Sequence, residues 1–127
     1  RFSFVLTNDG RLFGCGKNKH GVLGVGDSRM RYKLTPITNT FGNNVKIVSA
    51  DFHDNTAICL SSDGSVFTWG KNSNCIQEDF ANKFVDSSVP VQVQFLSGVK
   101  IVEIGVSDSH FYAVTCDRVN LLTWGKC

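Results

Sequence analysis

Short apolar runs separated by turn signals recur along this chain and predict an all-β structure. The clearest set lies in the middle, where 45–50 reads VKIVSA, 56–62 reads TAICLSS and 65–70 reads SVFTWG. Asp63-Gly64 separates the last two runs and predicts a two-residue hairpin turn of type I′, because that turn needs positive φ at both central positions. The runs therefore predict short antiparallel strands joined by tight turns.

A fourth, shorter strand is expected near Pro90 in VPVQV, where proline suits a sheet edge or a strand start. Several runs (FVL, AICL, FYAV) are apolar at nearly every position, whereas a sheet with one solvated face alternates apolar and polar residues. Blades packed face to face around an axis bury both faces of each sheet. Four short antiparallel strands per unit, with no stretch at helical period, therefore predict the blades of a β-propeller.

The same pattern returns at a fixed spacing. Gly16, Gly70 and Gly125 are separated by 54 and 55 residues, and Trp69 and Trp124 directly precede the last two. Such self-similarity is the signature of stacked or radially arranged units. A shift of 54 places carries Asp9-Gly10 onto Asp63-Gly64, Phe13 onto Phe67, Pro36 onto Pro90, Phe41 onto Phe95, and 45–48 onto 99–102.

This spacing divides the chain into units. We interpret 1–127 as a fragment of one propeller domain, with the end of one repeat at 1–16, a complete repeat at 17–70 and a second repeat at 71–125. The chain starts without methionine inside an apolar run and stops just after a repeated motif. We therefore expect a piece of a longer protein, marginal or prone to aggregate in isolation because such repeats gain stability from their neighbours.

Composition excludes several classes of protein. Thirteen basic and eleven acidic residues give a net charge of +2, which does not indicate a nucleic-acid or membrane partner. The local cluster Arg29, Arg31 and Lys33 is interpreted as a solvated loop, with a patch for an acidic partner as the alternative. The five cysteines lack a C-x-x-C pattern, so we expect no metal, and their odd number together with the absence of an N-x-S/T sequon favours a reducing, intracellular compartment. No apolar run approaches the roughly 18 residues of a membrane span.

A glycine-rich stretch, GCGKNKHGVLGVGD at 14–27, raises the question of phosphate binding. The dinucleotide fingerprint G-x-G-x-x-G needs glycine where Lys19 stands, and the P-loop pattern is absent. We therefore expect these glycines to supply positive φ and close contact between blades, and we expect no cofactor. His20 and His53 lie in loops without a nearby nucleophile and are interpreted as incidental.

Together, the hairpin, the W-G pair and the glycine loop resemble the repeat of the regulator of chromosome condensation family. The closest stretches are IVEIGVSDSHFYAVTCD at 101–117 and GKNKHGVLGVGD at 16–27. WD repeats are shorter, at about 40 to 45 residues, and kelch repeats have a different glycine pattern. The resemblance implies a segment of a seven-bladed propeller. This chain departs from the family where Arg118 replaces a turn glycine and where KNSNCIQED replaces the second glycine loop, so we expect 73–88 to set what this protein binds.

The same resemblance suggests partner-contacting residues. Members act through loops on one propeller face, and in the exchange factor for the GTPase Ran acidic loop residues contact the GTPase. This implies partner contact for Asp54, Asp108 and His110. The alternative for His110 is structural, with its imidazole opening a strand and bonding to backbone between blades.

We therefore expect a non-enzymatic scaffold that binds a partner protein, cytoplasmic or nuclear, with no small-molecule substrate. The alternative is a guanine-nucleotide exchange factor for a small Ran-type GTPase. A third possibility is one module of a ubiquitin ligase or kinase whose catalytic domain lies elsewhere. Chromatin binding is not supported by the charge. A light-sensing role, as in the family's ultraviolet-B photoreceptor, is disfavoured because only one tryptophan stands in each of two units.

Overall fold

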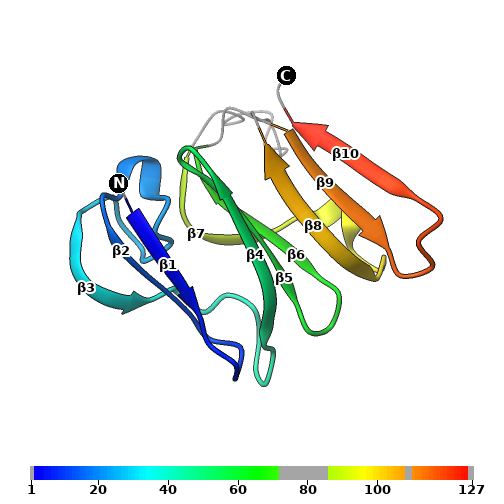
Figure 1. Ribbon diagram of the computed structural model, residues 1–127, viewed down its shortest axis with the longest axis horizontal. Coiled ribbons are helices and arrows are strands. Elements are labelled where there is room, and N and C mark those ends of the chain that lie inside the picture. Colours follow the sequence, from blue (N-terminus) through cyan, green and yellow to red (C-terminus); the bar gives the residue numbers. More distant parts are fainter. Residues whose placement is uncertain (1, 72–85, 108–109, 126–127) are drawn as a thin grey trace.

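Three antiparallel β-sheets lie side by side in the computed structural model, which describes residues 2–71, 86–107 and 110–125 (Figure 1). Two one-turn 3₁₀ helices, η1 (Lys19–Gly21) and η2 (Gln94–Leu96), are the helical elements of the described residues. The first sheet contains β1 (Phe2–Leu6), β2 (Leu12–Gly16) and β3 (Arg31–Pro36); the second contains β4 (Ile47–His53), β5 (Thr56–Ser61), β6 (Val66–Gly70) and β7 (Ser87–Gln92); the third contains β8 (Ile101–Ser107), β9 (His110–Thr115) and β10 (Leu121–Gly125).

The second sheet shows the complete set of four strands that the sequence predicts, in the order β4-β5-β6-β7. Strand β7 carries Pro90 and lies at the sheet edge, as expected. Every residue of β5 and β6 is buried. These strands therefore read as continuous apolar runs because neighbouring sheets cover both of their faces.

Corresponding strands of the first and second sheets are not all related by the shift of 54. Gly16 pairs with Arg31 and Gly70 with Ser87, so the connection that follows β6 is two residues longer than the one that follows β2. The ladder accordingly places Pro36 opposite Phe13, whereas Gln92 lies opposite Phe67. Pro36 is therefore structurally equivalent to Gln92, and the sequence alignment of Pro36 with Pro90 is wrong. The two residues inserted before β7 are offset by a connection after β7 that is two residues shorter, so the spacing of 54 is restored by β8.

Two buried apolar clusters fill the junctions between the sheets. The cluster at the first junction includes Leu12, Ile37, Ile47 and Trp69, and the cluster at the second includes Val66 and Phe111. Packing between sheets is thus the main source of burial. The repeat boundaries at 17–70 and 71–125 stay a prediction, because the second sheet takes strands from both units.

Candidate interaction surface

The Asp-Gly turns join each sheet to the next. The carbonyl of Gly10 accepts a hydrogen bond from the Ile47 amide at 2.9 Å, and the carbonyl of Gly64 accepts one from the Ile101 amide at 3.2 Å. Both glycines have φ of +86°, and a Cβ on Gly64 would lie 2.8 Å from the side chain of Lys100. The turns lie at the end of each sheet where β4 and β8 begin, and we call this end the Asp-Gly face. The repeated glycine is therefore needed for both its left-handed backbone and its contact with the next sheet.

The predicted type I′ geometry at Asp63-Gly64 is wrong, because only Gly64 has positive φ. The Gly64 amide donates to the Ser61 carbonyl at 3.0 Å and the Ser61 amide to the Ser65 carbonyl at 2.9 Å, the pattern of a type I turn followed by a left-handed bulge residue. The Asp63 carboxylate accepts hydrogen bonds from the Ser61 hydroxyl and from the Ser65 amide. The Ser61 hydroxyl bond, chiefly, lowers the pKa of Asp63. This local bonding favours the type I form. Arg118 takes the left-handed position, with φ of 58°, in the corresponding turn of the third sheet.

Trp69 closes the junction between the first two sheets from the other end. Its indole is 1% exposed, and its Nε1 donates to the Val22 carbonyl of the glycine loop at 2.7 Å. Gly70, with φ of +92°, follows it, and a Cβ there would overlap the Asn55 carbonyl oxygen. The W-G pair at 69–70 therefore contributes to packing at this junction.

The other repeat positions show the same structural use. Gly16 has φ of +105° and ends β2, and Gly125 ends β10 opposite His110. Trp124 stacks on Phe111, with ring centroids 5.4 Å apart. Its buried Nε1 has no acceptor among the residues that the structure describes.

The glycine loop is folded against the second sheet. A Cβ on Gly21 would meet Ser88 of β7 at 2.7 Å, and the Gly26 amide donates to the Ser88 carbonyl at 2.9 Å. Buried Asn18 organises the loop: its Nδ2 donates to the carbonyls of Asp27 and Arg29, and its Oδ1 accepts from the Leu23 amide. Close contact between sheets therefore accounts for Gly21 and Gly26.

His20 has a structural contact that sequence reasoning missed. It takes a left-handed φ of 61° in η1, and its Nδ1 lies 2.6 Å from Oδ2 of Asp86, just before β7. The two residues are 66 positions apart, so no local signal reveals the pair. His20 is thus one of the groups that fasten the first sheet to the second.

The basic cluster at 29–33 has one acidic partner among the described residues, Asp27. Both terminal nitrogens of Arg31 donate to the carboxylate of Asp27, each at 2.9 Å, and the Arg29 amide donates to it as well. These bonds, led by the one from Arg31, hold the pKa of Asp27 well below its ordinary value of 3.8. The arrangement favours an ordered loop over a patch for an acidic partner.

We expect the Asp27–Arg31 pair to make folding stability depend on acid. Because the pKa of Asp27 is lowered in the folded state, its contribution is present above the ordinary value of 3.8 and is lost as pH falls below it. Asp27→Asn is expected to lower the melting temperature at neutral pH and to flatten its decline towards pH of about 2. Thermal melts of the full-length protein across this range test it. Lys33→Gln, which removes a neighbouring charge, is the control, and an unchanged acid profile in Asp27→Asn would contradict the assignment.

Asp54 occupies the turn between β4 and β5, at the end of the sheets opposite the Asp-Gly face. Its side chain is 83% exposed and its φ is 54°. The neighbouring His53 lies with Nε2 at 3.6 Å from its carboxylate. The amide of Lys71, the residue after β6, donates a hydrogen bond to the Asn55 carbonyl at 2.8 Å and so holds the turn against the second sheet. Asp54 is thus an exposed carboxylate on a firmly held turn.

Of the other two candidates, His110 is the first residue of β9, and its side chain is exposed. Asp108 lies outside the described residues, as do Cys75 and Glu78 of the divergent segment. Sequence reasoning missed Asp51, whose carboxylate accepts from the Val106 amide at 3.0 Å and so links β4 to β8. This bond helps hold Asp54 and His110 in a fixed relation.

The described residues contain neither a metal-ligand cluster nor a membrane-spanning helix. No set of three or more His, Cys, Asp or Glu side chains gathers as a metal site within 2–71, 86–107 and 110–125. In the same ranges no helix has the length and apolar character needed to cross a membrane.

Sheets that are joined through Asp-Gly turns and packed tryptophans define this class of protein: the chain is a segment of a β-propeller. The sequence profile of the "Regulator of chromosome condensation (RCC1) repeat" matches residues 9–60 and 63–114. The chain belongs to the RCC1 repeat family.

Two relatives show the breadth of the family. The chain is 30% identical over 129 residues to the ultraviolet-B receptor UVR8 of Arabidopsis thaliana, which covers 99% of this chain and 28% of the receptor. It is 28% identical over 113 residues to the human "Probable E3 ubiquitin-protein ligase HERC6", covering 89% of this chain and 11% of the ligase. The chain thus spans a minor part of the curated relatives it matches.

Solved structures show the same fold. Human WBSCR16 superimposes with a TM-score of 0.85 at 18% identity, covering 98% of this chain and 30% of that one. The Saccharomyces cerevisiae protein Prp20, described with its binding properties to Gsp1p and histones, gives a TM-score of 0.78 at 22% identity, covering 98% and 31%. These neighbours are propellers, and the three sheets are consistent with a segment of a seven-bladed ring.

Proposed function

We propose that this chain is part of a non-enzymatic propeller whose Asp54 end docks a partner protein. One observation carries the proposal: the repeated residues are used in joining the sheets, while the Asp54 carboxylate is 83% exposed on a turn held by backbone bonding. A preorganised turn loses little conformational freedom on binding, so its carboxylate is available for recognition at low entropic cost.

We expect the start of β9 to extend this surface. His110 begins the third sheet's equivalent strand, and the Asp51–Val106 bond fixes the two sheets beside each other. Asp108, which precedes His110, stays a predicted contact. A partner with basic residues spaced to meet successive turns is complementary to these groups.

The second candidate function is guanine-nucleotide exchange on a small Ran-type GTPase. Its support is the likeness to Prp20, a protein described as binding Gsp1p and histones, together with an exposed loop carboxylate. Carboxylates of this kind would disturb the magnesium and phosphates of a bound nucleotide without covalent chemistry. The likeness to HERC6 supports a third role, as the recognition module of a ubiquitin ligase whose catalytic domain lies elsewhere.

We expect Asp54→Lys to weaken partner binding by about tenfold or more, because it reverses the charge of an exposed turn. The left-handed φ of 54° at this position adds a smaller cost in folding stability, which a thermal melt of the variant measures. The measurement compares quantitative affinity isolation by the full-length protein and by this variant. Glu103→Lys, an equivalent reversal on β8, is the matched control. The expected partners are proteins that are captured less by Asp54→Lys than by the unmodified protein, and that Glu103→Lys captures normally.

An identical set of captured proteins for both variants would count against the Asp54 end. Purified protein mixed with a panel of small GTPases then separates the two candidate functions. Accelerated nucleotide release that Asp54→Lys abolishes favours the exchange factor over the scaffold.

A further inference from the structure

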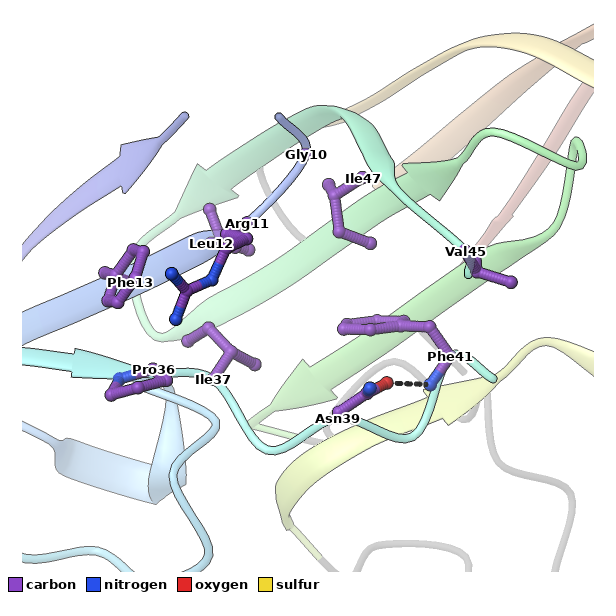
Figure 2. A pocket seen from close by; sticks show the side chains of 10 residues that line it. All are labelled: Gly10, Arg11, Leu12, Phe13, Pro36, Ile37, Asn39, Phe41, Val45 and Ile47. Carbon is purple, nitrogen blue, oxygen red and sulfur yellow. Dashed lines mark hydrogen bonds between the residues drawn. The ribbon is translucent and has the colours of Figure 1, made fainter. Parts of the chain in front are cut away.

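A hollow of about 250 Å³ opens between the first and second sheets at the Asp-Gly face (Figure 2). Its volume exceeds the roughly 150 Å³ of an apolar cavity that accepts benzene. Its walls are mainly apolar, and they come from the first sheet, from the connection to β4, and from the start of β4. The lining residues are Gly10, Arg11, Leu12, Phe13, Pro36, Ile37, Asn39, Phe41, Val45 and Ile47.

The second junction shows what fills the equivalent place. The Ile37 amide donates to the Leu12 carbonyl, and the Val93 amide donates in the same way to the Val66 carbonyl. Ile47 and Ile101 are likewise equivalent, since each begins the first strand of its sheet and donates its amide hydrogen to the glycine carbonyl of an Asp-Gly turn. In the second junction these walls belong to a buried cluster that also contains one more side chain, Leu96 of η2, which is 3% exposed.

The first junction has no such leucine. The connection 38–46 does not form a 3₁₀ helix after Ile37. Its Phe41 lines one side of the hollow and packs edge-on against Phe67, with ring centroids 4.8 Å apart, and Asn39 Oδ1 accepts a hydrogen bond from the Phe41 amide at 3.0 Å (Figure 2). The next residue is Gly42, which has no side chain to offer. The same apolar walls are thus left with a space where the second junction places Leu96.

One cationic side chain, Arg11, lies among the residues that line the hollow. Arg11 is exposed, and its guanidinium lies 4.8 Å from the ring centroid of Phe13. Neither Arg11 nor Lys46, which touches Gly10, forms an ion pair within the described part of the chain, although Asp9 lies close enough to feel the charge of Arg11. Apolar walls beside one exposed cation are complementary to an aliphatic group next to a carboxylate.

We infer that this hollow is a docking pocket for a partner polypeptide, which inserts one leucine-sized aliphatic side chain and places a neighbouring Asp or Glu carboxylate on Arg11. The inserted side chain occupies the place that Leu96 holds in the second junction. The pocket extends the proposed function of a protein-interaction propeller. It lies at the Ile47 end of β4, whereas Asp54 follows the other end, so the two surfaces can be tested separately.

The test is a titration of the full-length, isoleucine-methyl-labelled protein with the capped peptide acetyl-Gly-Glu-Leu-Glu-Gly-amide, followed by NMR. We expect saturable shifts of the Ile37 and Ile47 methyl groups, with a dissociation constant on the order of millimolar for so small a ligand. The Ile101 methyl group, at the junction that Leu96 already fills, is the internal control and should not move.

Variants and peptide analogues separate the contribution of the Arg11 charge from that of the apolar hollow. Arg11→Gln should weaken binding about three- to tenfold, and replacing both peptide glutamates with glutamine should do the same; Arg29→Gln is the matched control. Val45→Phe, which fills the hollow, and a peptide with alanine for leucine should abolish the shifts.

Shifts that persist in Val45→Phe, or equal shifts at Ile101, would overturn the assignment. So would saturable binding of N-acetyl-leucine without binding of the peptide, which would indicate a small-molecule site, or self-association lost in Arg11→Gln, which would indicate a second copy. If the peptide does not bind but Asp54→Lys still loses partner proteins, the docking pocket is refuted and the proposed function stands.

Discussion

Replacing Trp69 with alanine is expected to lower the free energy of unfolding by about 3–5 kcal/mol. The indole is 1% exposed and belongs to the cluster that joins the first two sheets. It also packs edge-on against Phe52, with centroids 6.2 Å apart. Alanine would leave a cavity at the junction and an unsatisfied Val22 carbonyl, which adds to the loss of apolar burial. Urea denaturation of the full-length protein, followed by circular dichroism, measures the change.

Two further variants separate packing from hydrogen bonding. Trp69→Phe keeps most of the aromatic contact but loses the bond to Val22, so we expect a loss of about 1–3 kcal/mol. Tyr32→Ala, at a side chain that is 90% exposed, should change stability by less than about 0.5 kcal/mol. A Trp69→Ala variant as stable as Tyr32→Ala would show that the indole does not hold the junction.

Gly70→Ala should destabilise the protein by about 2–6 kcal/mol through two combined effects. A left-handed φ of +92° strains any residue with a Cβ, at a cost of roughly 1–3 kcal/mol. The Cβ would also overlap the Asn55 carbonyl, which accepts from the Lys71 amide, and such overpacking costs roughly 1–3 kcal/mol more. Denaturation under the same conditions gives the value.

Gly98→Ala isolates the backbone contribution. Gly98 has a similar φ of +82°, but a Cβ there would meet no described atom within 4 Å. We therefore expect about 1–2 kcal/mol for this variant, clearly less than for Gly70→Ala. Equal losses at the two positions would mean that the contact with Asn55 contributes nothing.

Strand existence and strand type were predictable because they depend on local signals. The apolar runs around 56–62 and 65–70 became β5 and β6, and Pro90 was placed correctly on an edge strand. The turn at Asp63-Gly64 was located correctly but given the wrong type. An Asp-Gly pair fits both geometries, and the bonds from Ser61 and Ser65 to Asp63 favour the observed one.

Contacts between distant segments were beyond sequence reasoning. His20 was interpreted as incidental because its partner Asp86 lies 66 residues away, and the link from Asp51 to Val106 spans 55. The shift of 54 also aligned Pro36 with the wrong residue, Pro90. The two residues inserted before β7 are offset by a shorter connection after it, so the overall repeat spacing does not reveal the insertion. The candidate surface at Asp54 followed from family resemblance and not from any chemical pattern.

The sequence by itself determined the blade: apolar runs, Asp-Gly turns and tryptophan-glycine pairs at a spacing of 54 to 55 residues specify strands, their order and the family. These features act over a few residues, so they can be seen without a fold. Only the tertiary structure decided how neighbouring sheets fit together. One junction is closed by Leu96, whereas the other keeps an apolar hollow beneath Arg11, because the path of a connection depends on packing between sheets and not on the residues of that connection alone.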